Sequence, residues 1–170
     1  MSIRTTESFL REHATLRDHV EHLPVAAREL PQVERGERID MVERITAFLA
    51  EMLLPHAAAE EGVLYPQAAK LLGEPDGSDA VAGDRAQVRV LLSALAGADP
   101  DDVGALQEVI YALYALLSSH VWREEELYLK LTSVPDGARA GAILRRTADA
   151  EHRGGRFKRT HRRDVVTPPW

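Results

Sequence analysis

The sequence predicts an all-α protein that folds as an up-down-up-down four-helix bundle, with a short fifth helix near the C-terminus. Apolar residues make up 45% of the 170 residues but aromatic residues only 5%, a balance that disfavours β-sandwiches and barrels. Apolar residues recur at steps of three and four through four separate stretches, which is the spacing of an amphipathic helix. The links between these stretches are short, so successive helices should run antiparallel.

The first two helices follow from two stripes of residues predicted to be buried. The first helix should end at Pro24, because proline disrupts a helix interior. The second should begin soon after Gly36 and fade near Leu72, and Pro55 should bend it just before His56. The first stripe comprises Phe9, His13, Leu16, Val20 and Leu23, and the second Ile45, Leu49, Met52, His56, Glu60 and Val63.

The third and fourth helices have recognisable starts. Ser78 and Asp79 can cap the third helix, and Gly97 can end it. The segment "DPDD" should open the fourth helix, with Asp99 as the cap and Pro100 in the first helical position. The third stripe comprises Val81, Arg85, Val88, Leu92 and Leu95, and the fourth Leu106, Ile110, Leu113, Leu117, His120, Glu124, Leu127 and Leu131.

The chain is predicted to form one domain followed by two C-terminal segments, because 170 residues suffice for one sizeable core but not comfortably for two. Residues 1–134 form the predicted bundle. Residues 135–152 open with a Pro-Asp-Gly turn and include "ARAGAILRRTADAEH", the predicted fifth helix. Residues 153–170 are rich in arginine, so we expect a basic, mobile tail.

Composition excludes several kinds of function. The chain contains no cysteine, so disulfides, thiolate nucleophiles and cysteine-based metal sites are excluded. No window contains the roughly 18 consecutive apolar residues of a membrane helix, so we expect a cytoplasmic protein with no membrane partner. The formal net charge of −6 disfavours nucleic acid as a partner. A protein partner is not identifiable from the sequence.

The most informative residues are polar side chains that interrupt the apolar stripes. His56 and Glu60 are four residues apart on the second helix, as are His120 and Glu124 on the fourth, so each pair points into the same space. His13 lies in the stripe of the first helix. One such pair could arise by chance, but two on separate stripes with a third histidine could hardly do so. Three imidazoles and two carboxylates form a ligand set for a transition metal, and carboxylates can bridge two ions.

Other polar residues near these motifs are predicted to lie away from the ligand set. His19 and His22 are rotated by about 120° and about 180° from His13 around the first helix, so we expect both at the surface. We expect solvent or supporting contacts for the carboxylates beside the two pairs and packing roles for the tyrosines that follow them. The C-terminal histidines could reach the pocket only through a fold-back. The carboxylates are Glu61 and Glu125, the tyrosines are Tyr65 and Tyr128, and the C-terminal histidines are His152 and His161.

Three motifs resemble those of the hemerythrin-like HHE cation-binding domain family. They are "LREHATLRDHV", "LLPHAAAEEGVLYP" and "LLSSHVWREEELYLKL" on the first, second and fourth helices, and the resemblance covers residues 5 to 133. It implies a non-haem di-iron centre whose two carboxylates bridge the irons. By motif, the implied ligands are His13, His56, Glu60, His120 and Glu124. Family members bind dioxygen, respond to oxygen, nitric oxide or iron, or show peroxide chemistry, so the fold does not choose between carrier, sensor and enzyme.

The third helix departs from the family pattern. The family usually supplies one or two histidines there, whereas the matching stretch "GDRAQVRVLLSAL" has Arg85 at the ligand position and Arg89 one turn later. A guanidinium has no available lone pair and stays protonated, so it cannot bind a metal. The iron held jointly by the third and fourth helices would then keep only His120 and the carboxylates.

Three functions remain open. The first is a hemerythrin-like protein with a binding or sensing role, which holds one iron ion rather than two, or zinc, and takes dioxygen or another small ligand. The second is a metal-free structural or interaction bundle, in which Arg85 replaces the missing cation by pairing with Glu60 and Glu124. Arg85 would point to solvent instead if the third helix were rotated. The third, a di-iron oxygen- or peroxide-reactive enzyme, is disfavoured because it needs the second iron.

Overall fold

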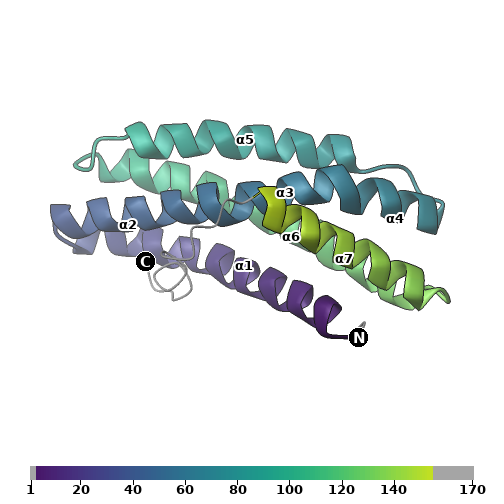
Figure 1. The fold of residues 1–170 in the computed structure, drawn as a ribbon. Helices are drawn as coiled ribbons and strands as arrows, with labels where there is room; N and C mark the ends of the chain where they lie inside the picture. Colours follow the sequence, from purple (N-terminus) through teal and green to yellow (C-terminus); the bar gives the residue numbers. More distant parts are fainter. Residues whose placement is uncertain (1–2, 155–170) are drawn as a thin grey trace.

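The computed structural model describes residues 3–154, and all regular structure in that range is helical (Figure 1). The all-α prediction is therefore confirmed. The four predicted helices of the bundle alternate in direction, each antiparallel to the one before it (Figure 1). Residues 155–170, which include His161 and most of the predicted basic tail, lie outside the described residues.

The first helix, α1 (Ile3–Glu29), continues past Pro24, so the predicted end of this helix is wrong. Ala26 and Leu30 are buried beyond the proline. Burial of this extra apolar surface offsets the backbone hydrogen bond that the proline removes. The chain then forms a short 3-10 turn, η1 (Leu30–Gln32).

The predicted second helix is a continuous series of five helical segments. Two of them are π-helical, and each π segment is followed by a segment with a proline in its first turn. The wider π turn accommodates the ring and the missing amide hydrogen of Pro55 and of Pro66. The segments are α2 (Arg35–Phe48), η2 (Leu49–Leu53), α3 (Leu54–Ala59), η3 (Glu60–Leu64) and α4 (Tyr65–Leu72).

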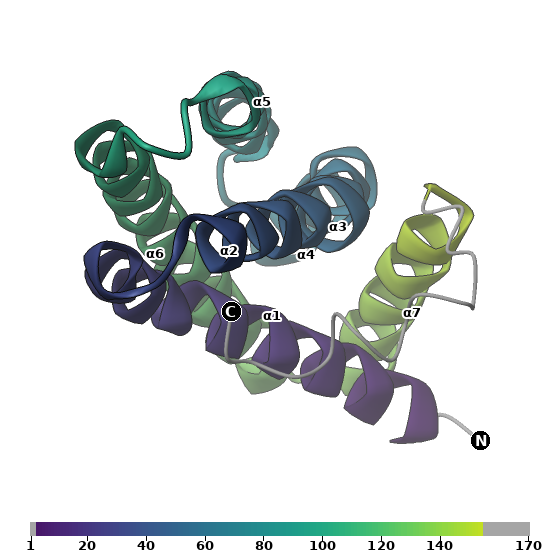
Figure 2. The same ribbon diagram turned by 90° about the vertical axis from the view of Figure 1, so that its left-hand side faces the viewer.

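The third and fifth predicted helices are both present. The third is α5 (Ser78–Gly97), which ends at Gly97 as predicted, but its N-cap is Gly77 and no side chain caps it, so the prediction that Ser78 or Asp79 caps this helix is wrong. The fifth is α7 (Gly137–Gly154), which has 18 residues and is longer than the short helix expected. It packs against α1, α3, η3, α4 and α6, and Figure 2 shows it beside α3 and α4.

The fourth predicted helix, α6 (Val103–Ser133), begins later than expected. The Asp102 amide donates to the Asp99 carbonyl at 3.0 Å, which closes a turn with Pro100 at the second position, a place that proline favours. The cap is Asp102, whose Oδ1 accepts a hydrogen bond of 3.0 Å from the Ala105 amide. The prediction that Asp99 caps this helix is therefore wrong by one turn.

The apolar core consists of two clusters. The larger cluster lies between α1, α2, η2, α5 and α6, and its members on α6 end at Val121. The smaller cluster joins α4 and the end of α6 to α7, and begins at Leu64 and Tyr128. The segments between the two clusters are residues 54–63, which contain His56 and Glu60, and residues 122–127, which contain Glu124 and begin two residues after His120. A polar layer is therefore sandwiched between two apolar ones.

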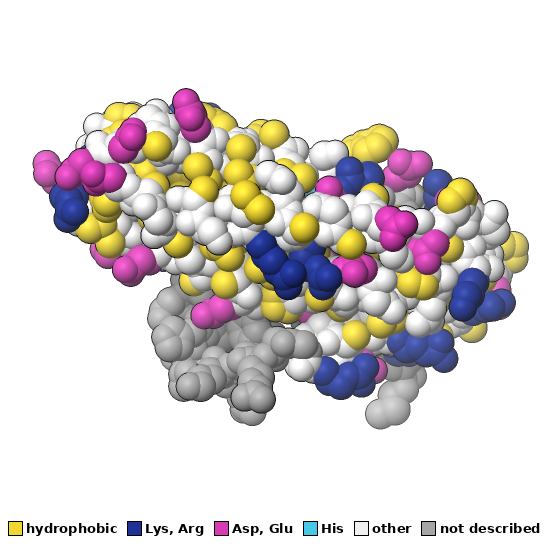
Figure 3. Space-filling view, turned by 90° about the horizontal axis from the view of Figure 1, so that it is seen from above, with side chains coloured by type: hydrophobic (Ala, Val, Ile, Leu, Met, Phe, Trp, Pro, Cys, Tyr) yellow, Lys and Arg dark blue, Asp and Glu magenta, His cyan; other side chains and the backbone are white. Residues whose placement is uncertain are grey.

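None of the described helices combines the length and the apolarity needed to cross a membrane. Viewed from above, the left end of the visible face carries mostly acidic side chains, whereas basic side chains lie mainly over its middle and right (Figure 3).

Candidate metal centre

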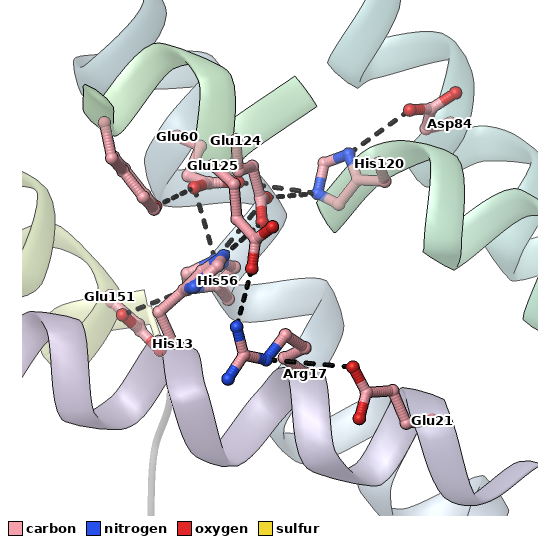
Figure 4. A network of polar contacts seen from close by, with 11 residues as sticks. His13, Arg17, Glu21, His56, Glu60, Asp84, His120, Glu124, Glu125 and Glu151 are labelled. Atoms are coloured by element: carbon pink, nitrogen blue, oxygen red, sulfur yellow. Dashed lines mark hydrogen bonds and ion pairs between the residues drawn. The ribbon is translucent and has the colours of Figure 1, made fainter. Parts of the chain in front are cut away.

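The five residues predicted as ligands meet in one buried layer, although they come from four helical segments (Figure 4). α1 contributes the first histidine, α3 the second, η3 the first carboxylate, and α6 the remaining pair. None of the five is more than 5% exposed. In chain order they are His13, His56, Glu60, His120 and Glu124.

Glu124 lies between histidines of three helices. Its Oε2 is 2.6 Å from His13 Nε2, and its Oε1 is 2.6 Å from His120 Nε2. The same Oε1 is 3.7 Å from His56 Nε2. This one carboxylate therefore contacts all three imidazoles.

Glu60 occupies a similar position across the layer. Its Oε1 is 3.2 Å from His56 Nε2, and its Oε2 is 3.5 Å from His120 Nε2. Tyr128 donates a hydrogen bond of 2.9 Å from its hydroxyl to Glu60 Oε1, and its ring meets His13 edge-on at 4.9 Å between centroids. Tyr128 thus orients a carboxylate of the layer, a role that goes beyond the packing expected from the sequence.

The ligand atoms form two overlapping groups, each with its atoms within 4.8 Å of one another. One group consists of His13, His56 and Glu124, and we call it the histidine-rich half. The other consists of Glu60, His120 and Glu124, and we call it the histidine-poor half. The two halves share Glu124, which is the arrangement expected of a bridging carboxylate.

The chemistry of this layer fits a cation. Glu60 Oε2, His120 Nε2 and Glu124 Oε1 are buried and make no hydrogen bond in the structure, although the last two lie 2.6 Å apart. Buried polar atoms are nearly always hydrogen-bonded. Three exceptions in one place, all carrying lone pairs that converge, indicate that the layer is built around an ion.

Two carboxylates on the outer side of the layer were not predicted. Asp84 Oδ2 on α5 lies 3.2 Å from His120 Nδ1, and Glu151 Oε2 on α7 lies 3.4 Å from His56 Nδ1. Asp84 lies outside the predicted stripe of the third helix, so the stripe gives no signal for it. Glu151 could have been found, because it continues the three- and four-residue spacing of the buried residues of α7, which are Ala140, Ile143, Leu144, Thr147 and Ala148.

Arg85 does not pair with Glu60 or Glu124, so that predicted pairing is wrong. Its Nη2 lies 2.7 Å from Glu61 Oε2, and the two side chains are 23% and 27% exposed. Asp84 faces the layer instead and also forms an ion pair with Arg123. The cause is the phase of α5: its buried residues Val81, Val88 and Leu95 are seven apart, which leaves position 85 at the edge of the interface.

Among the remaining histidines, the prediction for His19 is wrong. It is 1% exposed and stacks on Phe48 with 4.9 Å between the ring centroids, because α2 covers this side of α1. His22 has a side chain that is 38% exposed, as predicted, and His152 is exposed on α7. His19 packs against the larger apolar cluster and is not part of the polar layer.

In the protein without metal, protons can balance the buried carboxylates. Burial opposes the charging of His56, but Glu60, Glu124 and Glu151 outweigh it and raise its pKa well above 6.5. Burial likewise opposes the charging of His120, but Glu124, Asp84 and Glu60 raise its pKa to about 11. Burial acts to raise the pKa of Glu124, but contacts with Glu60 and with His120 outweigh it and hold that pKa well below 4.5.

These shifts predict how the stability of the metal-free protein changes with pH. A raised histidine pKa contributes stability that is complete below the unfolded value of 6.5 and is lost as pH rises toward the folded value. The depressed pKa of Glu124 contributes stability above 4.5. We therefore expect the free energy of unfolding, measured by urea titration with a chelator present, to fall steadily between pH 6.5 and about pH 9. A constant or rising free energy over this range would contradict the imidazolium–carboxylate pairs.

Comparison with known proteins gives one match. A family model described as the hemerythrin HHE cation binding domain matches residues 4–132. The matched segment contains all five predicted ligands and ends before α7. No curated protein and no solved structure matches the chain.

Proposed function

Because the chain belongs to the hemerythrin HHE cation-binding domain family, we propose that it is an iron-binding protein whose ligands are the five residues of the polar layer. The observation that carries the proposal is the position of the two carboxylates. Glu124 contacts three histidines and Glu60 two, and buried oxygens of both lack hydrogen bonds. Imidazole and carboxylate together suit iron, and they suit zinc as an alternative.

We further propose that one ion is held more tightly than a second. The histidine-rich half offers two imidazoles, His13 and His56, whereas the histidine-poor half offers only His120. The reason is that α5 presents Asp84 and Arg85 here and no histidine. Because the histidine-poor half is weakened, chemistry that needs two irons is disfavoured, and a binding or sensing role fits the site better. We propose that the protein performs this role in the cytoplasm.

The residues around the layer define what a bound ion could do. Iron held there would supply a coordination position for a small ligand such as dioxygen or nitric oxide. Apolar clusters on both sides exclude bulk water from the layer. A small crevice leads to His120, and most of its wall is apolar, which suits a small neutral ligand. It is lined by Leu53, Leu54, Ala57, Asp84, Arg85, Val88, Leu117 and His120.

Metal analysis tests the proposal directly. After anaerobic loading with ferrous iron and removal of free metal, we expect the wild-type protein to retain about one equivalent or more, and His56→Ala to retain less than about a tenth of one. His22→Ala is the matched control, because it removes an exposed histidine of α1, and it should retain as much metal as the wild type. Wild-type protein that retains less than about a tenth of an equivalent of iron or zinc would overturn the proposal.

A metal-free interaction bundle is the second candidate, and one observation favours it. The raised pKa values of His56 and His120 allow imidazolium groups to neutralise the carboxylates, so the layer needs no arginine for this purpose. The same metal analysis separates the two candidates. A protein that folds normally and binds no ion under any loading condition would support the interaction bundle.

A further inference from the structure

We propose that Glu151, which lies on α7 beyond the matched family segment, positions the metal ligand His56. The fifth helix would then be part of the metal centre and not an appendage to it. This inference rests on the proposed function, since it assigns His56 as a ligand.

The two nitrogens of His56 face in different directions (Figure 4). Nε2 faces the layer, at 3.2 Å from Glu60 Oε1 and 3.7 Å from Glu124 Oε1. Nδ1 faces α7, at 3.4 Å from Glu151 Oε2. The imidazole ring therefore lies between Glu151 and the metal ligands Glu60 and Glu124. Glu151 can act on the ion only through His56.

The packing of α7 determines where Glu151 lies. The buried face of α7 contacts α4 and α6 through the smaller apolar cluster, to which Ile143, Leu144 and Ala148 belong. Glu151 follows on that same face, and its side chain is 19% exposed. Its Oε2 is buried and makes no hydrogen bond in the structure. A carboxylate in such a place is costly unless it has a partner, and Glu151 forms an ion pair with His56 through Nδ1.

The chemistry of histidine ligands explains what the contact achieves. A neutral imidazole carries its proton on one nitrogen and can bind a metal only through the other. A carboxylate that accepts a hydrogen bond from Nδ1–H keeps the proton on Nδ1 and leaves the Nε2 lone pair free to bind a metal. The same hydrogen bond fixes the ring orientation. Glu151 would therefore direct the Nε2 lone pair of His56 into the histidine-rich half.

The other side of the layer repeats the pattern. His120 faces the ligand atoms through Nε2, and its Nδ1 lies 3.2 Å from Asp84 Oδ2. Two histidines on different helices thus have a carboxylate behind them, one supplied by α5 and one by α7. This repetition indicates that the contact between His56 and Glu151 belongs to the site.

Glu151→Leu is the decisive variant, because leucine preserves the packing of α7 but cannot accept a hydrogen bond from His56. We expect the zinc affinity, measured by competition with a chromogenic chelator, to fall ~10- to 100-fold. The metal-free variant should fold with a thermal midpoint equal to or lower than that of the wild type, because His56 loses one of its carboxylate partners. Glu151→Gln retains an oxygen acceptor and should recover part of the affinity. Asp149→Ala removes an exposed acid of α7 and should change neither quantity.

A second measurement follows the imidazole itself. In zinc-loaded protein labelled with ¹⁵N-histidine, the Nδ1 proton of His56 should give a signal that is protected from solvent exchange, and Glu151→Leu should abolish it. If the wild type binds zinc and Glu151→Leu binds it equally well, the positioning role is overturned while the proposed function stands. If the wild type itself binds no zinc or iron, both fail. Loss of zinc affinity in Glu151→Leu without loss of the protected Nδ1 signal would show a merely structural role and would also overturn the inference.

Discussion

Glu124→Ala should abolish metal binding altogether, which is the largest functional loss that we expect from a single substitution. Glu124 belongs to both halves of the site and contacts three histidines, so no half keeps its ligands without it. We expect less than about a tenth of an equivalent of iron after loading, measured by elemental analysis. His120→Ala should affect only the histidine-poor half and leave the tightly held ion in place.

The neighbouring residue provides the control for this experiment. Glu125 stands next to Glu124 on α6, its side chain is 41% exposed, and it accepts a hydrogen bond from Arg17. Glu125→Ala removes the same charge and should bind as much metal as the wild type. Retention of a full equivalent of iron by Glu124→Ala would refute the shared-carboxylate arrangement.

The second large effect concerns stability in the absence of metal. His120→Leu removes one imidazolium from the layer and leaves Glu124 and Glu60 with less compensation. Removal of one partner of a buried ion pair typically costs about 3–5 kcal/mol, and we expect a loss of that order in the free energy of unfolding, measured with urea and a chelator at about pH 6.

A double substitution separates the ion pair from simple packing. Glu124→Leu combined with His120→Leu replaces both charges by apolar groups, which is often nearly neutral. The double variant should therefore be more stable than His120→Leu alone, with a coupling energy of about 1–3 kcal/mol. Additive losses would show that the two side chains contribute independently and that their 2.6 Å contact carries little energy.

Most of the fold could be predicted from the sequence, because the apolar spacing reports directly on which faces are buried. The errors occur where local signals compete with packing. Pro24 was expected to end α1, but burial of Leu30 beyond it keeps the helix intact. Asp99 and Asp102 are equally good caps by residue type, and only the turn around Pro100 decides between them. The two π turns were not predicted, since nothing in residue spacing distinguishes them from a proline bend.

The candidate site was predictable to the extent that it depends on spacing along one helix. The four-residue spacing places His56 beside Glu60 and His120 beside Glu124, and both pairs lie in the layer. The rotation of α5 was not predictable, because one residue corresponds to about 100° around a helix, and this difference puts Asp84 rather than Arg85 against His120. The spacing of α7 places Glu151 on its buried face, but the contact of Glu151 with His56 depends on how α7 docks, which no local pattern describes.

The division of the core into two apolar clusters has a consequence for the motions of the protein. Separate apolar units can open independently, and here the polar layer between them is held, without metal, by contacts between histidines and carboxylates. An ion bound to residues from α1, α3, η3 and α6 would cross-link these segments between the two apolar clusters. Metal binding would then make the two apolar clusters unfold together, as one cooperative unit. A partner that binds at either end of the bundle, away from the ligands, could therefore distinguish the metal-bound protein from the metal-free one.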